Sequence, residues 1–572
     1  MIDLKAKPFN LSDEDIKWVQ DTLSNLSLDE KIGQIFVDML WNNTADEVKE
    51  RINKYGIGGF RYNNMSPEEL YEQNKVIQET SKIPALIAAN IEAGGDGGVK
   101  GGTHFGYHVT IGATQDKENA YKLGYYGCKE AAAIGCNWTF APIVDINKNW
   151  RNCVVSNRCF SSEADVVLEM SKEYLQGAKD AGLASCMKHF PGDGLRDQHI
   201  VTTNNTMSCE EWNKNFGKVY RGMIDAGVEA VMIGHIRLPE YSRKLRPGIK
   251  DNEIMPATIA PELLQDLLRG ELGFNGLVIT DATHMVGLTS AIRREDMIPT
   301  ALAAGCDMIL YYRDKDEDIN ALKKGLENGT LTYERLDEAV TRVLAFKAML
   351  KLHKKKEQGN LIPEKEGVSV VGCKEHLEIA KNIADKAITL VKNTKNQLPI
   401  KPETHKRIML YTIDQTGSAA AVSMANEGSL EARVKAKLES IGFKVDTFNP
   451  QGGLNGKQLL AMTPIKEFVN KYDAVMLFVN VAGFSQSNVR RITWSMPMGP
   501  DIPWYVTELP TVCVSVNNSF HLMDVPMVPT YINAYNGNDT SLDLVIEKIM
   551  GESEFKGVSP VDAFCSAWDT RL

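Results

Sequence analysis

Short apolar runs alternate with amphipathic stretches of helical length over the first part of the chain. This alternation is typical of repeated βα units. It predicts eight strands, at residues 32–37, 56–61, 85–90, 137–144, 184–190, 228–235, 276–281 and 306–311. It also predicts helices between them, at residues 67–80, 117–135, 164–181, 209–226 and 261–271. Eight units within this length favour a closed (β/α)8 barrel over an open sheet.

The alternation resumes after a polar stretch at residues 354–367. Strands are predicted at residues 407–413, 444–448, 474–481, 511–516 and 530–535, with helices between them, as in a doubly wound α/β layer. This region contains neither a GxGxxG nor a Walker loop, which argues against a nucleotide-binding role. The sequence therefore predicts a catalytic barrel domain at 1–353, a linker at 354–367 and a second α/β domain at 368–572.

The predicted barrel strands end in polar residues, on the side where a barrel builds its active site. Asp281 ends the apolar run Gly276–Thr280. A buried carboxylate in that place suits nucleophilic attack on an anomeric carbon, although an aspartate there can also cap the next helix. The other polar strand ends are Asn90, Glu92, Arg158, Lys188, His189, His235 and the pair Tyr312-Arg313. So many polar groups at one mouth indicate a polyol or another polar ligand.

A second group of polar residues follows the fifth predicted strand, in the stretch from Lys188 to His199. Asp197 and His199 are separated by one residue, so the carboxylate can hold one imidazole nitrogen and fix the tautomer of the ring. Charged loops that are simply solvated show the same spacing. If the strand ends meet at one mouth, His199 is the best-placed proton carrier for chemistry at Asp281.

Charge and composition narrow the class of protein. The formal net charge is -10 and no basic stripe is present, which argues against nucleic acid or an anionic membrane as a partner. Neither a signal-peptide core nor an apolar window of membrane-spanning length is seen, so we expect a cytoplasmic protein. The ten cysteines include no Cys-x-x-Cys pair and are expected to be reduced. No metal-ligand spacing stands out, and a homodimer is left open.

The motifs together resemble glycoside hydrolase family 3, and most closely its branch of β-N-acetylglucosaminidases and β-glycoside phosphorylases. The resemblance runs through most of the barrel and into the second domain. It is carried by Phe140-Ala-Pro-Ile-Val-Asp-Ile-Asn147, Asn157-Arg-Cys-Phe160, Lys188-His-Phe-Pro-Gly192, Asp197-Gln-His199, Leu272-Gly-Phe-Asn-Gly-Leu-Val-Ile-Thr-Asp281 and Ile388-Thr-Leu-Val-Lys-Asn393.

The resemblance implies a role for each site residue. Asp281 would be the nucleophile, and His199 the general acid/base supported by Asp197. Arg158, Lys188 and His189 would hold sugar hydroxyls; Asn90, Glu92 and His235 complete the predicted substrate-binding set. The resemblance also implies that the second domain is an α/β sandwich, and in some branches of the family this domain lends residues to the active site. The segment 484–491 is the candidate for such a contribution.

Two positions depart from the family pattern. Asn90 stands where the family usually has an aspartate that grips sugar hydroxyls, and Asp193 stands where a histidine is common. Charged hydrogen bonds are worth about 1.5 to 3 kcal/mol, against roughly 1 kcal/mol for neutral ones. The change at Asn90 therefore leaves both glucose and N-acetylglucosamine open as the donor sugar.

A histidine acid/base also bears on the acceptor. An ordinary carboxylate in that role is anionic after protonating the leaving group, and it would repel a phosphate at about 4 Å by roughly 4 kcal/mol. A neutral imidazole removes this penalty, so phosphate is the expected co-substrate and no cofactor is expected. Arg196, Lys100 and the loop Gly94–Gly102 are candidate anion contacts. Hydrolysis by a β-N-acetylhexosaminidase or β-glucosidase is the first alternative, and an inactive sugar-binding module is a more distant one.

Overall fold

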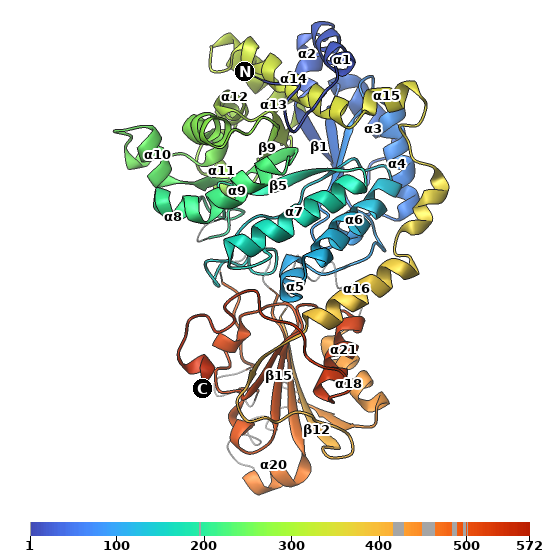
Figure 1. The fold of residues 1–572 in the computed structure, drawn as a ribbon, viewed down its shortest axis with the longest axis vertical. Helices are drawn as coiled ribbons and strands as arrows, with labels where there is room; N and C mark the ends of the chain where they lie inside the picture. The colour runs from blue at the N-terminus through green and yellow to red at the C-terminus, as the bar shows by residue number, and fades with distance from the viewer. Residues whose placement is uncertain are drawn as a thin grey trace. The chain divides into compact units, whose positions relative to one another are not determined.

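The computed structural model describes residues 2–193, 196–415, 428–448, 464–482, 489–495, 499 and 501–572. The chain divides into two compact units (Figure 1). The first unit comprises Met1–Phe105, Lys117–Ile146 and Glu163–Leu377, and the second comprises Gly106–Asp116, Asn147–Ser162 and Glu378–Leu572. Two short segments from within the range predicted for the barrel therefore group with the second unit. Of the segment 484–491, residues 484–488 lie outside the described residues.

The first unit is a closed barrel of eight parallel strands, which confirms the predicted fold class. Around the barrel the strands follow the order β1, β10, β9, β7, β5, β4, β3, β2. Their bounds are β1 Phe36–Leu40, β2 Gly59–Tyr62, β3 Leu86–Ala89, β4 Trp138–Thr139, β5 Ala184–Phe190, β7 Ala230–Ile233, β9 Leu277–Ala282 and β10 Met308–Leu310. The separate pair β6 (Thr203–Asn204) and β8 (Ile236–Arg237) lies outside the barrel sheet.

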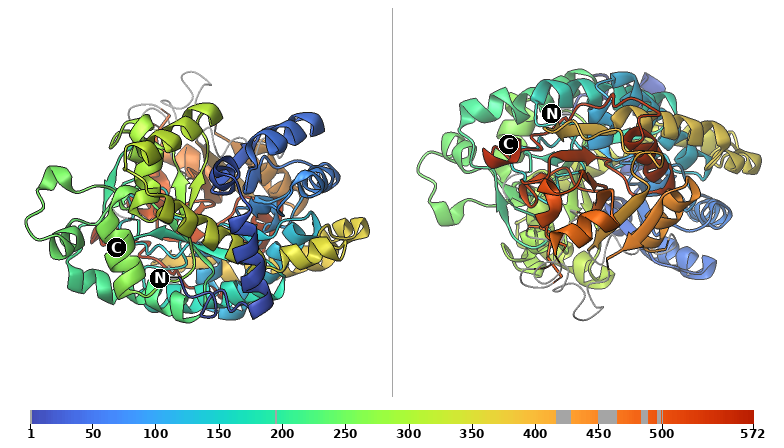
Figure 2. Two further views of the ribbon diagram at one scale, coloured as in Figure 1. Left: turned by 90° about the horizontal axis from the view of Figure 1, so that it is seen from above. Right: turned by 90° about the horizontal axis from the view of Figure 1, so that it is seen from below.

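Helices surround the barrel strands (Figures 1 and 2). The main ones are α2 Leu28–Gln34, α3 Ala45–Tyr55, α4 Pro67–Thr80, α6 Lys117–Ala133, α7 Ala164–Asp180, α9 Phe216–Asp225, the π-helix η4 Glu262–Glu271, α12 Arg294–Ala304, α13 Lys315–Glu327 and α14 Tyr333–Met349. The other helices of this unit include α1 Asp13–Ser24, α8 Cys209–Lys214, α10 Pro239–Leu245, α11 Val286–Thr289 and α15 Leu352–Glu357. No helix in the described parts of the chain is both long and apolar enough to cross a membrane.

Local sequence explains where the predicted elements fit and where they fail. Helix α4 begins at the predicted residue because Ser66 caps it, accepting from the backbone N–H of Glu69, and Pro67 occupies its first turn. The first predicted strand was wrong over residues 32–34, because a capping box of Ser27 and Glu30 starts helix α2 there. The fourth was predicted too long: Pro142 has no N–H for the ladder, and β4 ends at Thr139.

The second unit contains a six-stranded mixed sheet in the order β11, β16, β15, β14, β12, β13. The strands are β11 Thr389–Asn393, β12 Arg407–Asp414, β13 Lys444–Thr447, β14 Ala474–Asn480, β15 Thr511–Ser515 and β16 Thr530–Asn533. Alternate side chains along β12 pack into two hydrophobic cores, one on each face of the sheet. Ile408 and Leu410 pack with α18 (Leu430–Ser440) and α21 (Asp539–Ile549), whereas Met409 packs with α20 (Ile465–Lys471). This α/β layer agrees with the prediction; β11, which pairs antiparallel with β16, was not among the predicted strands.

Candidate active site

The candidate site residues follow the carboxyl ends of neighbouring barrel strands. Going round the barrel, Asp281 lies in β9, His235 follows β7, Lys188 and His189 lie in β5, and Asn90 and Glu92 follow β3. The carboxyl ends of parallel strands open on the same side of a barrel. The structure therefore brings the predicted nucleophile and most of the predicted sugar-binding residues to one mouth.

Asp281 is a buried carboxylate held among histidines. Its exposed fraction is 9%, and its Oδ2 lies 3.9 Å from Nε2 of His189. Burial alone would raise the pKa of Asp281, but electrostatic interaction with His189, followed by His235 and His199, holds that pKa below its ordinary value. The carboxylate is therefore ionised at neutral pH, as a nucleophile must be.

His189 is oriented by a second buried carboxylate. Its Nδ1 lies 2.7 Å from Oδ2 of Asp145, and Oδ1 of Asp145 accepts hydrogen bonds from the backbone N–H groups of His189 and, at 2.8 Å, of Asp193. A carboxylate only accepts hydrogen bonds, so Nδ1 of His189 carries a proton and Nε2 faces Asp281. Asp145 is thus a positioning residue for a histidine that faces the candidate nucleophile.

Lys188 and Glu92 form a buried ion pair. Nζ of Lys188 lies 2.6 Å from Oε1 of Glu92, with side-chain exposures of only 3% and 9%. An ammonium group has three N–H donors, so the pair leaves Lys188 able to donate to a sugar hydroxyl. Asn90, two residues before Glu92, is half-buried. Among the described residues its side chain has no hydrogen-bond partner. Both geometries are compatible with the predicted contacts to sugar hydroxyls.

Asp197 and His199 form the predicted dyad. Oδ1 of Asp197 lies 2.6 Å from Nδ1 of His199 and also accepts the backbone N–H of His199 at 2.8 Å. The Asp197 side chain is buried, whereas the imidazole is 25% exposed. With Nδ1 engaged, Nε2 is the nitrogen that can exchange a proton with a ligand. This is the arrangement that a histidine general acid/base requires.

Gln198, between these two residues, is a contact that the sequence did not reveal. Its Nε2 donates to Oδ2 of Asp281 at 3.0 Å, and its Oε1 accepts the backbone N–H of His235 at 2.5 Å. The backbone carbonyl oxygen of Gln198 accepts the N–H of Gly287 in α11. A Cβ atom at Gly287 would lie only 2.4 Å from that oxygen, so this close approach requires glycine. The loop that carries the dyad is therefore fastened to the candidate nucleophile and to the helix that follows it.

His235 is fully buried, and both its ring nitrogens are engaged. Nε2 lies 3.0 Å from the carbonyl oxygen of Ala282 and Nδ1 lies 2.8 Å from Oγ1 of Thr258. A carbonyl only accepts, so Nε2 is the donor, and burial lowers the pKa of His235. A neutral imidazole fits these contacts. The geometry favours a positioning role, holding the residue after Asp281, over the predicted contact with sugar.

Two further predictions concern Arg158 and the proposed anion-binding loop. Arg158 lies in Asn147–Ser162, a segment of the second unit, and its sugar-binding role stays a prediction. In the loop Gly94–Gly102, the amides of residues 97 to 100 and 102 already donate to backbone carbonyls. That loop therefore offers few free amides to an anion. Lys100 and Arg196 are exposed.

The strand ends also bring in three residues that were not predicted, namely Arg61, His284 and Tyr311. The prediction had placed Tyr312 and Arg313 at the mouth. Instead, the ring of Tyr312 stacks on Phe36 with centroids 3.8 Å apart, and Tyr311 stacks on His284, three residues after Asp281. Among the described residues, no three or more His, Cys, Asp or Glu side chains are arranged to hold a metal ion.

Comparison with known proteins decides the family. The family model described as "Glycosyl hydrolase family 3 N terminal domain" matches residues 27–346. The chain belongs to glycoside hydrolase family 3. It is 41% identical, over the full length of both chains, to a protein from Cellulomonas fimi named "Beta-N-acetylglucosaminidase/beta-glucosidase". The family 3 chain described here is therefore an enzyme of the glycosidase type.

Two solved structures resemble the whole family 3 chain. One is titled "Beta-glucoside phosphorylase BglX bound to 2FGlc"; it is 38% identical, with a TM-score of 0.92 and 99% of each chain covered. The other is a glycoside hydrolase family 3 β-N-acetylglucosaminidase from Paenibacillus sp., 25% identical, with a TM-score of 0.77, covering 95% of this chain and 100% of that one. The similar structures thus include both a phosphorylase and a β-N-acetylglucosaminidase.

Proposed function

We propose that this enzyme transfers a terminal β-glucosyl or β-N-acetylglucosaminyl unit to phosphate, with retention of configuration. Asp281 attacks the anomeric carbon while His199, as imidazolium, gives its Nε2 proton to the departing oxygen. The bond to the leaving group breaks and a glycosyl ester of Asp281 forms. A phosphate oxygen then attacks the anomeric carbon, the ester bond breaks, and Asp281 leaves as a carboxylate. The product is a β-sugar 1-phosphate.

The observation that carries this proposal is the pairing of His199 with Asp197 beside the mouth. Three other carboxylates near the mouth, Glu92, Asp145 and Asp197, are each held by a lysine or a histidine. A histidine is therefore the group in a position to move the proton. Once neutral, it does not repel an incoming anion, whereas a carboxylate at about 4 Å would oppose phosphate by roughly 4 kcal/mol, or about three orders of magnitude in rate.

The names of similar proteins support two acceptors. The structure with a TM-score of 0.92 is named a β-glucoside phosphorylase, and the 41% identical relative is named as a β-N-acetylglucosaminidase and β-glucosidase. Hydrolysis is therefore the second candidate function, and both sugars remain candidates for the donor. Phosphate is preferred because the acid/base group is a histidine.

The test is an assay of the purified chain with 4-nitrophenyl β-glucoside and 4-nitrophenyl β-N-acetylglucosaminide, with and without phosphate. Sulfate at equal ionic strength is the matched control. A phosphorylase should turn over faster as phosphate is added, and it should form one β-sugar 1-phosphate for each nitrophenol released. If the rate ignores phosphate and only free sugar appears, the enzyme is a hydrolase. The donor that supports the higher kcat/KM identifies the preferred sugar.

A further inference from the structure

Arg61 in β2 is a half-buried arginine at the mouth that the mechanism above leaves unused. In the sheet register Arg61 pairs with Met39 of β1 and Ala88 of β3. Successive side chains of a strand point to opposite faces. Its neighbours Phe60 and Tyr62 are fully buried, and Tyr62 contacts Cys136 between α6 and β4. Arg61 therefore points to the opposite face, into the barrel.

The residue that follows the neighbouring strand β3 on the side of Arg61 is the neutral Asn90. Arg61 pairs with Ala88, and Asn90 follows two residues later, just after the end of β3; if the extended backbone continues, its side chain lies on the same face as Arg61. Strand spacing and rise place the two Cα atoms about 8 Å apart. Asn90 is neutral, so this neighbour does not offset the charge of the guanidinium.

The guanidinium of Arg61 has donors to spare. Its Nη1 donates to the carbonyl oxygen of Tyr62 at 2.6 Å. No Asp or Glu among the residues that the structure describes lies within ion-pair distance of it. An arginine has five N–H donors in a planar fork that matches the oxygens of a phosphate or carboxylate. A half-buried arginine without a carboxylate partner is the kind of group that binds an anionic ligand.

His284 and Tyr311 connect this arginine to the candidate nucleophile. The two rings stack with centroids 6.1 Å apart and 17° between their planes. His284 is exposed, and within the described part of the chain its ring nitrogens have no hydrogen-bond partner. Burial is the main cause that raises the pKa of Tyr311; the charge of Arg61 lowers it and that of Asp281 raises it further. Tyr311 thus lies within electrostatic reach of both.

We propose that Arg61 and His284 bind the phosphate that takes the glycosyl unit from Asp281. The guanidinium fork holds two phosphate oxygens, His284 donates an N–H to a third, and Tyr311 supports the imidazole ring. One oxygen remains to attack the anomeric carbon. This inference rests on the proposed phosphorylase function, and it replaces the loop Gly94–Gly102 and Lys100 as the predicted anion contacts.

The experiment measures the KM for phosphate at saturating nitrophenyl donor, together with the rate of the first nitrophenol burst, in which phosphate takes no part. Arg61→Met keeps the aliphatic stem and removes the charge, and it should raise the KM for phosphate about 10- to 100-fold. Arg61→Lys keeps the positive charge but lacks the forked guanidinium, so its KM for phosphate should lie between those of the wild type and Arg61→Met. His284→Phe keeps the stacking on Tyr311 and should raise the KM for phosphate by about 3- to 10-fold. The burst rate should change less than about threefold.

Lys100→Met, which removes an exposed cation of the neighbouring loop, is the matched control and should leave the KM for phosphate unchanged. Thermal melting of every variant checks that it is folded. If Arg61→Met slows the burst or raises the KM of the donor with an unchanged KM for phosphate, the assignment is wrong and Arg61 contacts the donor sugar. A wild-type enzyme whose rate ignores phosphate overturns the proposed function itself. If the wild type depends on phosphate but the Arg61 and His284 variants keep the wild-type KM for phosphate, only the proposed phosphate site is overturned.

Discussion

The barrel buries two aspartates on neighbouring strands, at opposite ends. Asp281 lies at the carboxyl end of β9, whereas Asp307 immediately precedes β10 and accepts the backbone N–H of Val278 near the start of β9. Burial would raise the pKa of both carboxyl groups, yet in both cases nearby positive charge holds the pKa below its ordinary value. The two sites differ in the residues that supply this charge.

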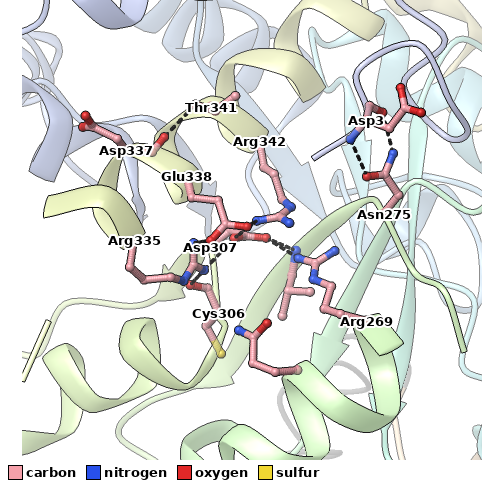
Figure 3. Close-up of polar contacts among 12 residues, drawn as sticks. Asp3, Arg269, Asn275, Cys306, Asp307, Arg335, Asp337, Glu338, Thr341 and Arg342 are labelled. Atoms are coloured by element: carbon pink, nitrogen blue, oxygen red, sulfur yellow. Dashed lines mark hydrogen bonds and ion pairs between the residues drawn. The ribbon is translucent and has the colours of Figure 1, made fainter. Parts of the chain in front are cut away.

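Asp307 is held by arginines (Figure 3). Oδ2 lies 2.8 Å from Arg269, and Oδ1 lies 2.7 Å from Arg335 and 3.4 Å from Arg342. Arg269 also donates to the carbonyl oxygens of Phe274 and Gly276. A guanidinium keeps its charge at every pH that a protein tolerates. The arginines therefore stabilise the ionised form of this carboxylate, which links η4, α14 and two strands at the amino end of the barrel.

Asp281 is held instead by histidines, whose charge can change. In the proposed mechanism Asp281 forms a glycosyl ester and loses its negative charge, and a fixed cation beside it would then be left buried and unpaired. An imidazole can release a proton and become neutral. In this proposal a buried aspartate has a structural role where its partners are arginines, and a reactive role where its partners are histidines that can titrate.

Replacing Asp281 by asparagine should have the largest effect of the changes that probe this contrast. The amide has nearly the same shape but is a poor nucleophile, so kcat on a nitrophenyl donor should fall by about 10⁴-fold. The melting temperature should stay within a few degrees of the wild type, because the amide keeps the shape of the side chain and loses only one of the two hydrogen bonds donated by Gln198 and by the N–H of Ala282. Activity above about one per cent of the wild type would show that another group is the nucleophile.

Replacing Asp307 by asparagine should have the opposite profile. Arg269 and Arg335 would lose the carboxylate nearest to them, and Arg342 would keep only Glu338. This should lower the free energy of unfolding by about 3 to 5 kcal/mol. The kcat of the molecules that remain folded should be close to that of the wild type. Urea unfolding and active-site titration measure the two quantities separately.

The matched control for Asp307 is Asp337→Asn. Asp337 lies on α14 near the same cluster, but it pairs with Lys31 and its side chain is 43% exposed. Such a pair contributes about 1 kcal/mol or less. If Asp307→Asn unfolds at the same urea concentration as this control, the arginine cluster does not stabilise the barrel.

The sequence predicted the barrel and the chemical residue types of the site, because strand ends with Asp281, His199 and Lys188 are visible without a structure. It did not predict Arg61 or Tyr311. Their importance depends on register, and a shift of one residue moves a side chain to the opposite face of a strand. Tyr312 was predicted to face the mouth, but Tyr311 is the residue that lies near Asp281.

Gln198 could not be found for a different reason. Its role comes from contacts with Asp281 in β9 and with His235 after β7, which are distant from it in the sequence. Its neighbours Asp197 and His199 were visible because an Asp-x-His pair is local in the sequence. Local capping likewise placed α4 correctly, whereas contacts between distant strands need the closed barrel.

Lys347 tests the role of counter-charges with the smallest expected effect. It lies on α14, the helix that carries Arg335 and Arg342, and is fully buried, but its Nζ donates to the neutral Oε1 of Gln34 at 2.6 Å. Among the described residues it has no carboxylate within ion-pair distance. Burial lowers the pKa of Lys347 from 10.5 to about 7.

A folded-state pKa below the unfolded one means that this group's contribution to stability is complete above pH 10.5. It is lost progressively as the pH falls from 10.5 to about 7, because the unfolded chain binds the proton first. Lys347→Met should therefore raise the free energy of unfolding by about 1 to 4 kcal/mol at pH 7, and the gain should shrink as the pH approaches 10. Arg335→Met, on the same helix, removes a cation that has a carboxylate partner and should destabilise instead. Urea unfolding of both variants at pH 7 and pH 10 measures these changes. If Lys347→Met lowers the free energy of unfolding at pH 7, the buried amine of Lys347 does not destabilise the folded state.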